Sequence, residues 1–388
     1  MKSAGETSMH HNIGRYEEQL EGYNAFIPAH LPYSPDLEYN DTLHSMLSEA
    51  DRAMTALDVL VEMLPNPDHF IWMLARKEAL LSSQIEGTIA TYYGILAYEA
   101  DISIDEDPNQ IREVTNYMQA MKTGLEMVRT GPITVMMLCD LHKILLTQVR
   151  GARALPGKIR PIQNQIGGDS LFNARYIPPP QEYVRFLLQD LEKFMADDTS
   201  MPPLIMSSLI HAQFEMIHPF LDGNGRMGRL LIGLFLCSRG ILLKPTLNIS
   251  YYLKRNQDIY YNRLSALEKD GDLEGWVTFF LQGVIEVSHD SRELVQKIVR
   301  LERNLLKRVI SENIGGIHGA QMIELLFTKA ILTSSDIAEH CGVSIQTANN
   351  LVKKFEDASI VREITGWKRN RKYIFTEYVR LMAEGTNP

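Results

Sequence analysis

The stretch from His218 to Arg229 contains the residue types needed to bind a nucleotide and to attack it. Its sequence, HPFLDGNGRMGR, combines an imidazole, a carboxylate and two guanidiniums with a glycine-rich turn. At the start of a helix, such a turn points free backbone N–H groups and the positive end of the helix dipole at one place, which favours anion binding. We therefore expect this stretch to bind a metal-bound triphosphate.

The residues on either side predict how the stretch is positioned. A helix over residues 203–217 must end near His218, because the residue before a proline is pushed out of the helical region. Phe220 is expected to point into the core and to fix the loop. A second helix should begin near Asn224 and run to Leu236 with one apolar side buried.

Each polar side chain of the stretch has a predicted role. Unperturbed histidine titrates near about pH 6.5, so His218 can accept a proton at neutral pH. Asp222 is the predicted Mg²⁺ ligand, because Mg²⁺ in a phosphate site needs only one or two carboxylates. Arg226 and Arg229 share a helix face and suit the β- and γ-phosphates. Together these roles predict attack of a hydroxyl on the α-phosphate, with pyrophosphate as the leaving group.

The same stretch resembles the signature of the Fic family, H-x-F-x-[DE]-G-N-G-R-x-x-R, at every fixed position. The resemblance implies a protein adenylyltransferase that transfers AMP from ATP, with Mg²⁺, to a Ser, Thr or Tyr hydroxyl of a target protein. It also implies an all-α fold, a helical bundle with a small β-hairpin called the flap. The predicted catalytic residues are His218, Asn224 and Arg226, and the predicted nucleotide contacts are Glu86, Gly223, Asn224, Gly225, Arg226, Arg229, Tyr260 and Tyr261.

Residues 66–87 predict a helix that carries a regulatory carboxylate. Asn66 suits the N-cap, Pro67 the first helical position and Gly87 the C-terminal end. Glu86 lies in the last turn, where a carboxylate opposes the helix dipole and favours a cationic partner. The sequence SSQIEG resembles the inhibitory motif of the Fic family, [ST]-x-x-x-E-[GN], with Ser82, Glu86 and Gly87 at its fixed positions. The resemblance implies that Glu86 pairs with Arg229 and inhibits the enzyme.

Two further segments resemble parts of the same family. A short hairpin is predicted in which residues 158–162 pair with residues near Ile166. It resembles the Fic flap, so Lys158, Ile159, Arg160 and Ile166 are expected to dock the target backbone, as an exposed strand edge can. Tyr260 and Tyr261 resemble the tyrosine pair that contacts the base and ribose. They point to different helix faces, so one of them is expected to stack on the base, with Tyr251 and Tyr252 as competing candidates.

The sequence predicts four regions. An N-terminal arm covers residues 1–40, a helical region with the inhibitory helix covers 41–130, and the catalytic core covers 131–313. Residues 320–380 resemble a winged helix-turn-helix domain, with wing strands expected at Ile364–Gly366 and Arg371–Phe375. Residues 351–380 hold eight Lys and Arg against four Asp and Glu, so this region is locally basic. It could bind DNA or dock a protein, and the sequence leaves both open.

The composition limits which class of protein this chain can be. The 388 residues are 45% hydrophobic and 22% charged with a net charge of −9, which is typical of a soluble protein and argues against general nucleic-acid binding. Three widely spaced cysteines and the lack of a signal peptide or membrane span predict a cytoplasmic protein without membrane contact. Relatives suggest a homodimer. Two alternatives stay open: a DNA-binding regulator with a nucleotide-sensing core, and an enzyme that removes AMP from modified proteins.

Overall fold

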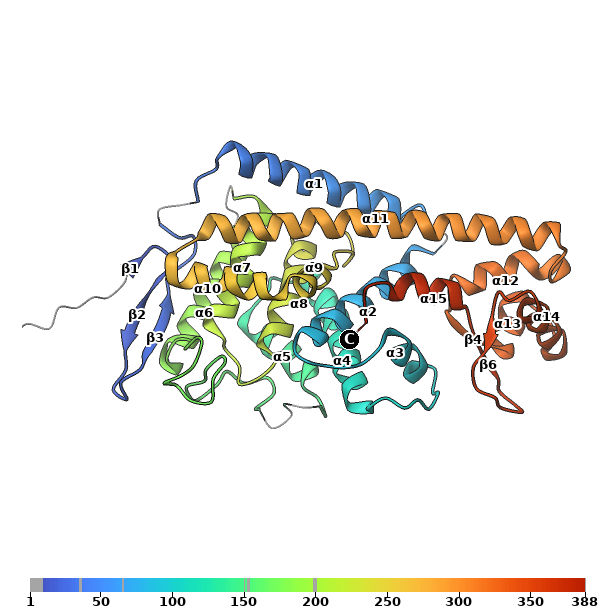
Figure 1. Cartoon of the computed structure of the whole chain (residues 1–388), viewed down its shortest axis with the longest axis horizontal. Helices are drawn as coiled ribbons and strands as arrows, with labels where there is room; N and C mark the ends of the chain where they lie inside the picture. The colour runs from blue at the N-terminus through green and yellow to red at the C-terminus, as the bar shows by residue number, and fades with distance from the viewer. Residues whose placement is uncertain are drawn as a thin grey trace, which may run out of the picture.

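The protein is a mostly helical, elongated molecule, seen in the computed structural model of Figure 1. The structure describes residues 10–34, 37–64, 66–149, 151, 154–197 and 201–387. Its helices are α1 (Asp41–Val61), α2 (Pro67–Ile85), α3 (Tyr92–Glu99), α4 (Pro108–Val128), α5 (Val135–Leu145), α6 (Gln181–Ala196), α7 (Pro203–Ile217), α8 (Asn224–Ser238), α9 (Ile249–Arg255), α10 (Gln257–Asp270), α11 (Leu273–Ser311), α12 (Gly319–Leu326), α13 (Ser334–Cys341), α14 (Ile345–Asp357) and α15 (Thr376–Ala383).

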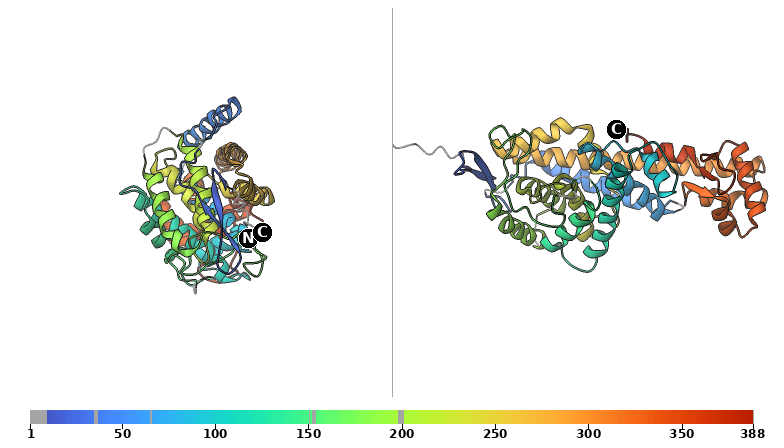
Figure 2. Two further views of the ribbon diagram at one scale, coloured as in Figure 1. Left: turned by 90° about the vertical axis from the view of Figure 1, so that its left-hand side faces the viewer. Right: turned by 90° about the horizontal axis from the view of Figure 1, so that it is seen from below.

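The helix α11 runs along almost the whole length of the molecule, and α1 packs beside it (Figures 1 and 2). One side of α11 is apolar over its full length, so it buries residues against the helical body at one end and against the C-terminal residues at the other. Because Asp272 caps its first turn by accepting a hydrogen bond from the Gly275 N–H, the start of this helix is fixed. The long helix therefore joins the two parts of the chain.

The helical body forms around α7 and α8, which pack against each other and against α2, α4, α5, α6 and α11. All but two of the fifteen residues of α7 are buried, which explains its nearly unbroken apolar sequence. Trp276 of α11 is buried here and donates its indole N–H to the Ser208 carbonyl at 3.0 Å. The helix predicted over residues 203–217 and the helix predicted from Asn224 are both confirmed.

The N-terminal residues form a small sheet that the sequence did not predict. Strands β1 (His10–His11), β2 (Gly14–Glu18) and β3 (Asn24–Pro28) pair antiparallel in the order β1-β2-β3. The Phe26 N–H donates to the Ile177 carbonyl at 2.9 Å, so the sheet lies against the chain that precedes α6. The part of the predicted surface arm that falls on residues 1–9, 35 and 36 lies outside the described residues.

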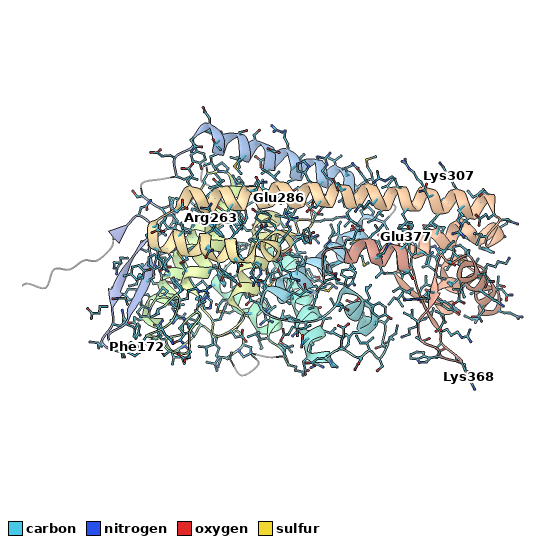
Figure 3. The ribbon with its side chains drawn as sticks, in the orientation of Figure 1. Phe172, Arg263, Glu286, Lys307, Lys368 and Glu377 are labelled. Atoms are coloured by element: carbon cyan, nitrogen blue, oxygen red, sulfur yellow. The ribbon has the colours of Figure 1, made fainter. Side chains whose placement is uncertain are left out.

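The C-terminal module, residues 316–383, consists of α12–α15 with a second antiparallel sheet. Strands β4 (Ile331–Thr333), β5 (Arg362–Glu363) and β6 (Lys372–Ile374) lie in the order β4-β6-β5. Strand β6 lies within the predicted wing strand Arg371–Phe375, but β5 ends before the other predicted strand, Ile364–Gly366, begins, so that prediction is wrong. Lys368 projects from the connection between β5 and β6 (Figure 3). A 3-10 turn at Gly316–His318 lies between α11 and α12. The assignment as a winged helix stays a prediction.

The described residues include no helix that is both long and apolar enough to cross a membrane. The cysteines Cys139, Cys237 and Cys341 are free thiols; Cys341 is buried, whereas Cys139 and Cys237 are partly exposed.

Candidate functional site

The backbone at His218 turns sharply between α7 and the loop that follows. His218 ends α7 in the left-handed region, with φ 48° and ψ 60°, a conformation rare for a residue with a side chain. The Arg160 Nε–H donates to the His218 carbonyl at 2.9 Å and fixes this turn from below. The helix end predicted from Pro219 is therefore confirmed, and the turn places the His218 imidazole on the wall of a cavity.

The His218 ring is held in one tautomer. Its Nδ1 lies 3.3 Å from the Glu215 carbonyl, which can only accept a hydrogen bond, so Nδ1 carries the proton and Nε2 is the acceptor. Burial, with a smaller contribution from the nearby Arg160 charge, lowers the pKa of His218 to about 4. The ring is therefore neutral at physiological pH and can accept a proton at Nε2.

The loop between His218 and α8 is closed by Asn224. Its Oδ1 accepts from the Phe220 N–H and its Nδ2 donates to the Phe220 carbonyl, both at 2.8 Å. Phe220 is buried, as predicted, and stacks on the His142 ring at 3.8 Å between centroids. Asn224 therefore shapes the loop, which explains why an asparagine with both a donor and an acceptor stands at this position.

His142 of α5 supports the same loop, a role that no local sequence pattern indicates. The Gly157 N–H donates to His142 Nδ1 at 2.9 Å, so the proton resides on Nε2, which donates to the Asp222 carbonyl at 2.9 Å. Burial lowers the pKa of His142 to about 4, which keeps this tautomer neutral. Only its place in the fold distinguishes His142 from any other helical histidine.

Arg229 is bound tightly by the end of α2. Its Nε–H donates to Ser82 Oγ at 2.9 Å, while Nη2 donates to the Ser82 carbonyl at 2.8 Å and to Glu86 Oε1 at 2.7 Å. Burial raises the pKa of the Glu86 carboxyl, but the Arg229 charge outweighs this effect and the pKa lies below its usual value. The helix predicted to carry this carboxylate is confirmed, with Asn66 as its N-cap and Glu86 as its C-cap.

The Glu86 carboxylate lies directly over Gly225, in the first turn of α8. A Cβ at Gly225 would collide with Glu86 Oε1, so only glycine allows this approach. The sequence predicted anion binding at the start of α8. The residue before this helix, Gly223, has the left-handed conformation, with φ 80°. A side-chain carboxylate thus occupies the predicted phosphate position.

Arg226 points to a different neighbourhood from Arg229. It is buried, with Nη1 3.8 Å from Glu113 of α4 and Nη2 3.7 Å from Asp222. Nε and Nη1 make no hydrogen bond to any described residue, so donors are left for an incoming acceptor. Thr88 donates to the same Glu113 carboxylate at 2.6 Å, which orients it toward Arg226.

Asp222 is partly exposed beside the same turn. Its Oδ1 accepts from the Gly223 N–H at 2.6 Å. Among the described residues no group of three His, Cys, Asp or Glu side chains is placed to bind a metal. The protein alone offers one carboxylate, which fits Mg²⁺ that takes its other ligands from phosphate oxygens and water.

A cavity of about 360 Å³ is lined by His218, Gly225 and Arg229, whereas Asp222, Asn224 and Arg226 are not on its wall. Tyr261 is the more exposed of the tyrosine pair on its wall, whereas Tyr260 is buried and its hydroxyl lies 2.9 Å from His211 Nε2. Tyr261 is therefore the candidate for stacking on a base. The competing Tyr252 packs on Phe279 outside this cavity. The predicted site residues on the wall are Glu86, Ile166, His218, Gly225, Arg229, Tyr260 and Tyr261.

The flap differs from the predicted hairpin. Ile166 pairs antiparallel with Tyr176, and no pairing joins residues 158–162 to Ile166 among the described residues. Arg160 is 1% exposed and donates to the carbonyls of His218, Ile162 and Pro179, because a buried guanidinium needs several acceptors. Arg160 thus stabilises the backbone at His218 from within the core and is not exposed for docking a target. Lys158 is exposed, Ile159 packs on the core, and Ile166 lines the cavity.

Comparison with known proteins connects this geometry to one family. Residues 44–126 match the profile of the Fic/DOC family N-terminal region, and residues 132–236 match the profile of the Fic/DOC family. A probable protein adenylyltransferase of Aquifex aeolicus is 32% identical over 99 residues, which is 26% of this chain and 28% of that protein. Protein adenylyltransferase Fic of Drosophila melanogaster is 30% identical over 217 residues, 53% of this chain and 40% of that protein. The chain thus spans less than half the length of either relative.

Two solved structures share the fold. A Fic family protein from Desulfovibrio desulfuricans G20 superposes with a TM-score of 0.59 at 22% identity, over 88% of this chain and 98% of that one. A Fic domain containing signaling protein from Bacteroides thetaiotaomicron gives a TM-score of 0.51 at 17% identity, over 65% of this chain and 97% of that one. At these identities the likeness concerns the fold alone.

Proposed function

Because the chain belongs to the Fic/DOC family, we propose that it is a protein adenylyltransferase, which transfers AMP from ATP to a Ser, Thr or Tyr hydroxyl of a target protein. The observation that carries the proposal is the cavity wall shared by the neutral His218, the start of α8 and Arg229. Curated relatives with the name protein adenylyltransferase support the reaction class.

In the proposed reaction His218 is the general base. Its Nε2 takes the proton from the target hydroxyl while the hydroxyl oxygen forms a bond to the α-phosphorus. The bond from the α-phosphorus to the oxygen bridging the β-phosphate breaks, and pyrophosphate leaves with that electron pair. The hydrogen bond from Nδ1–H to Glu215 O keeps Nε2 unprotonated and aimed at the cavity.

The remaining groups orient the triphosphate and stabilise its charge. Backbone N–H groups at the start of α8 and the guanidinium of Arg229 suit the outer phosphates. We propose that Arg226, whose Nη2 lies 3.7 Å from Asp222, binds phosphate oxygens beside that carboxylate. Asp222 would bind Mg²⁺, which supplies positive charge at the phosphate oxygens. Tyr261 offers a face for the base.

We propose that Glu86 inhibits this reaction in the resting protein. Its carboxylate takes up the Arg229 donor at 2.7 Å and occupies the space above Gly225. A terminal phosphate at the same place would meet a like charge and would lack the guanidinium. The enzyme therefore binds ATP weakly, or in an unproductive position, until Glu86 moves.

Label transfer from ATP radiolabelled at the α-phosphate tests the proposal. We expect little transfer to proteins of a cell lysate by the unmodified chain, strong transfer by Glu86→Gly, and none by Glu86→Gly/His218→Ala. Mass spectrometry of the labelled bands then identifies targets and the chain's own labelled hydroxyls. If Glu86→Gly transfers no more label than the double variant, the proposed function is wrong. Release of AMP from labelled proteins by the unmodified chain would favour the reverse reaction.

The C-terminal module offers a surface for a second partner. On α14, Gln346, Thr347, Asn349 and Asn350 are exposed, which is the arrangement expected of a recognition helix. We propose DNA as its ligand, because the surrounding residues 351–380 are basic. We also propose a homodimer, which the resemblance to the Fic family implies.

A further inference from the structure

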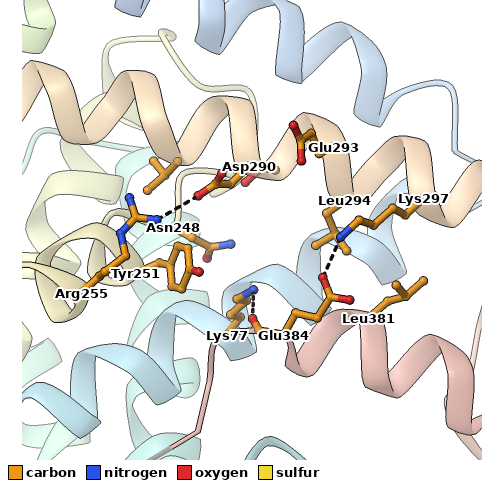
Figure 4. Close-up of a pocket in the computed structure, with 12 residues that line it drawn as sticks. Lys77, Asn248, Tyr251, Arg255, Asp290, Glu293, Leu294, Lys297, Leu381 and Glu384 are labelled. Carbon is orange, nitrogen blue, oxygen red and sulfur yellow. Dashed lines mark hydrogen bonds and ion pairs between the residues drawn. The ribbon is translucent and has the colours of Figure 1, made fainter.

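The C-terminal segment, residues 384–387, runs from α15 back across α2 and α9, and the end of the chain lies beside α2 in Figure 1. The Lys77 ammonium of α2, which is nearly buried, donates to the Glu384 carbonyl at 2.7 Å. Lys297 of α11 pairs with the Glu384 carboxylate at 2.8 Å, as Figure 4 shows. The segment is thus bound at its first residue by two helices of the helical body.

The next residues of the segment are bound by the last turn of α2. Gln84 donates from Nε2 to the Thr386 carbonyl at 2.9 Å and to the Ala90 carbonyl at 3.1 Å. The Lys254 ammonium of α9 donates to Gln84 Oε1 and to the Asn387 carbonyl, each at 2.7 Å. Thr386 is 3% exposed, so these bonds form in a protected place where hydrogen bonds are strong.

Gln84 stands two residues before Glu86 and two after Ser82, in the same turn of α2. Ser82 and Glu86 bind Arg229 on the active-site side of that turn. Gln84 binds the C-terminal segment and Lys254 on another side. The turn that carries Glu86 is therefore held on two sides, by Arg229 and by the segment that follows the C-terminal module.

We propose that Gln84, Lys254 and the C-terminal segment are positioning elements that hold Glu86 against Arg229, so that the placement of the C-terminal module sets the strength of inhibition. The inference rests on the proposed function of the site. A shift of α15 that withdraws the segment removes the Thr386 and Asn387 acceptors, so Gln84 keeps only its bonds to Ala90 and Lys254, and Lys254 keeps only its bond to Gln84. The last turn of α2 then loosens and Arg229 becomes available to ATP. This links the module to catalysis without any direct contact with the nucleotide cavity.

A double-variant comparison tests the proposal. Lys254→Ala removes the bonds to Gln84 and Asn387 at once and lies outside the cavity wall. We expect about a two- to thirtyfold rise in label transfer when Glu86 is present, the range found for substitutions that weaken the coupling between two sites. The effect should appear as a lower KM for ATP. In the Glu86→Gly background the same substitution should change transfer by less than about twofold, because no inhibition is left to relieve.

The matched control is Lys329→Ala, which removes a lysine pair of similar length, 2.6 Å to Asp336, inside the C-terminal module. It should leave transfer unchanged in both backgrounds, and Lys254→Arg should restore part of the inhibition. The proposal is overturned if Lys254→Ala leaves transfer unchanged beside Glu86, or changes it equally in both backgrounds.

Hydrogen exchange separates this inference from the proposed reaction. The amides of Ile85, Glu86 and Gly87 should exchange faster in Lys254→Ala than in Lys329→Ala, whatever chemistry the site performs. Equal exchange in the two variants refutes the positioning role even if adenylyl transfer is demonstrated. Faster exchange in a protein whose Glu86→Gly form transfers no label supports the positioning role and refutes only the reaction.

Discussion

Replacement of Glu86 by glycine should lower the stability of the nucleotide-free protein and raise its affinity for ATP. The side chain of Arg229 is 1% exposed and that of Glu86 is 32% exposed, so removal of the carboxylate leaves a buried guanidinium without its counter-charge. Loss of one partner of a fully buried pair costs about 3–5 kcal/mol, and the partial exposure of Glu86 reduces this to about 1–3 kcal/mol. An ATP phosphate that replaces the carboxylate recovers this free energy as affinity.

The expected consequence is a linked pair of changes. Without nucleotide, Tm of Glu86→Gly should fall by about 1–4 °C. The Kd for ATP should decrease by about 5- to 150-fold, the factor that corresponds to 1–3 kcal/mol of coupling. Differential scanning fluorimetry with and without ATP measures the first change, and isothermal titration calorimetry with a nonhydrolysable ATP analogue measures the second.

Another ion pair of the same length and similar exposure provides the control. Arg76 of α2 pairs with Glu99 of α3 at 2.7 Å, with side-chain exposures of 11% and 35%, and lies away from the nucleotide cavity. Glu99→Gly should lower Tm by a similar amount and leave the Kd for ATP unchanged. If Glu86→Gly leaves the Kd for ATP unchanged, or Glu99→Gly lowers it equally, the pairing of Arg229 does not govern nucleotide binding.

Three further outcomes follow from the same geometry. Asn224→Ala removes both hydrogen bonds that close the loop at Phe220, so the free energy of unfolding should drop by about 2 kcal/mol in urea titrations; an unchanged midpoint speaks against a supporting role. Because burial lowers the pKa of His218 to about 4, label transfer by Glu86→Gly should persist below pH 6.5 and decline only as pH falls through about 4; a midpoint near 6.5 in the pH–rate profile contradicts the assignment. Lys353→Ala should weaken DNA binding by the C-terminal module in a gel shift and reduce its salt dependence; equal binding by both forms, or none, argues against DNA contact through α14.

The active-site loop was predictable because its signals are local. Pro219 ends α7 at the histidine, and the glycine at Gly223 permits the turn that starts α8. Asn66 and Gly87 marked the ends of α2 in the same way, through capping preferences of single residues. Where a structural requirement is met by a residue and its immediate neighbours, the sequence is sufficient.

Contacts between distant segments were not predictable. His142 of α5 contacts the loop and Glu113 of α4 lies near Arg226 of α8, and no local sequence pattern distinguishes either residue. Ile166 pairs with Tyr176 and not with residues 158–162 as predicted, because glycine- and proline-rich segments specify register weakly. The N-terminal sheet lacks a clear alternation of apolar residues since its strands are short and packed on other segments.

A crystal structure of Glu86→Gly with a nonhydrolysable ATP analogue and Mg²⁺ tests the central claim most directly. We predict that the α-phosphorus lies within reach of a hydroxyl nucleophile that is hydrogen-bonded to His218 Nε2, and that the outer phosphates contact Arg229 and the start of α8. A nucleotide bound elsewhere, or one whose α-phosphorus lies far from the His218 ring, would contradict the account.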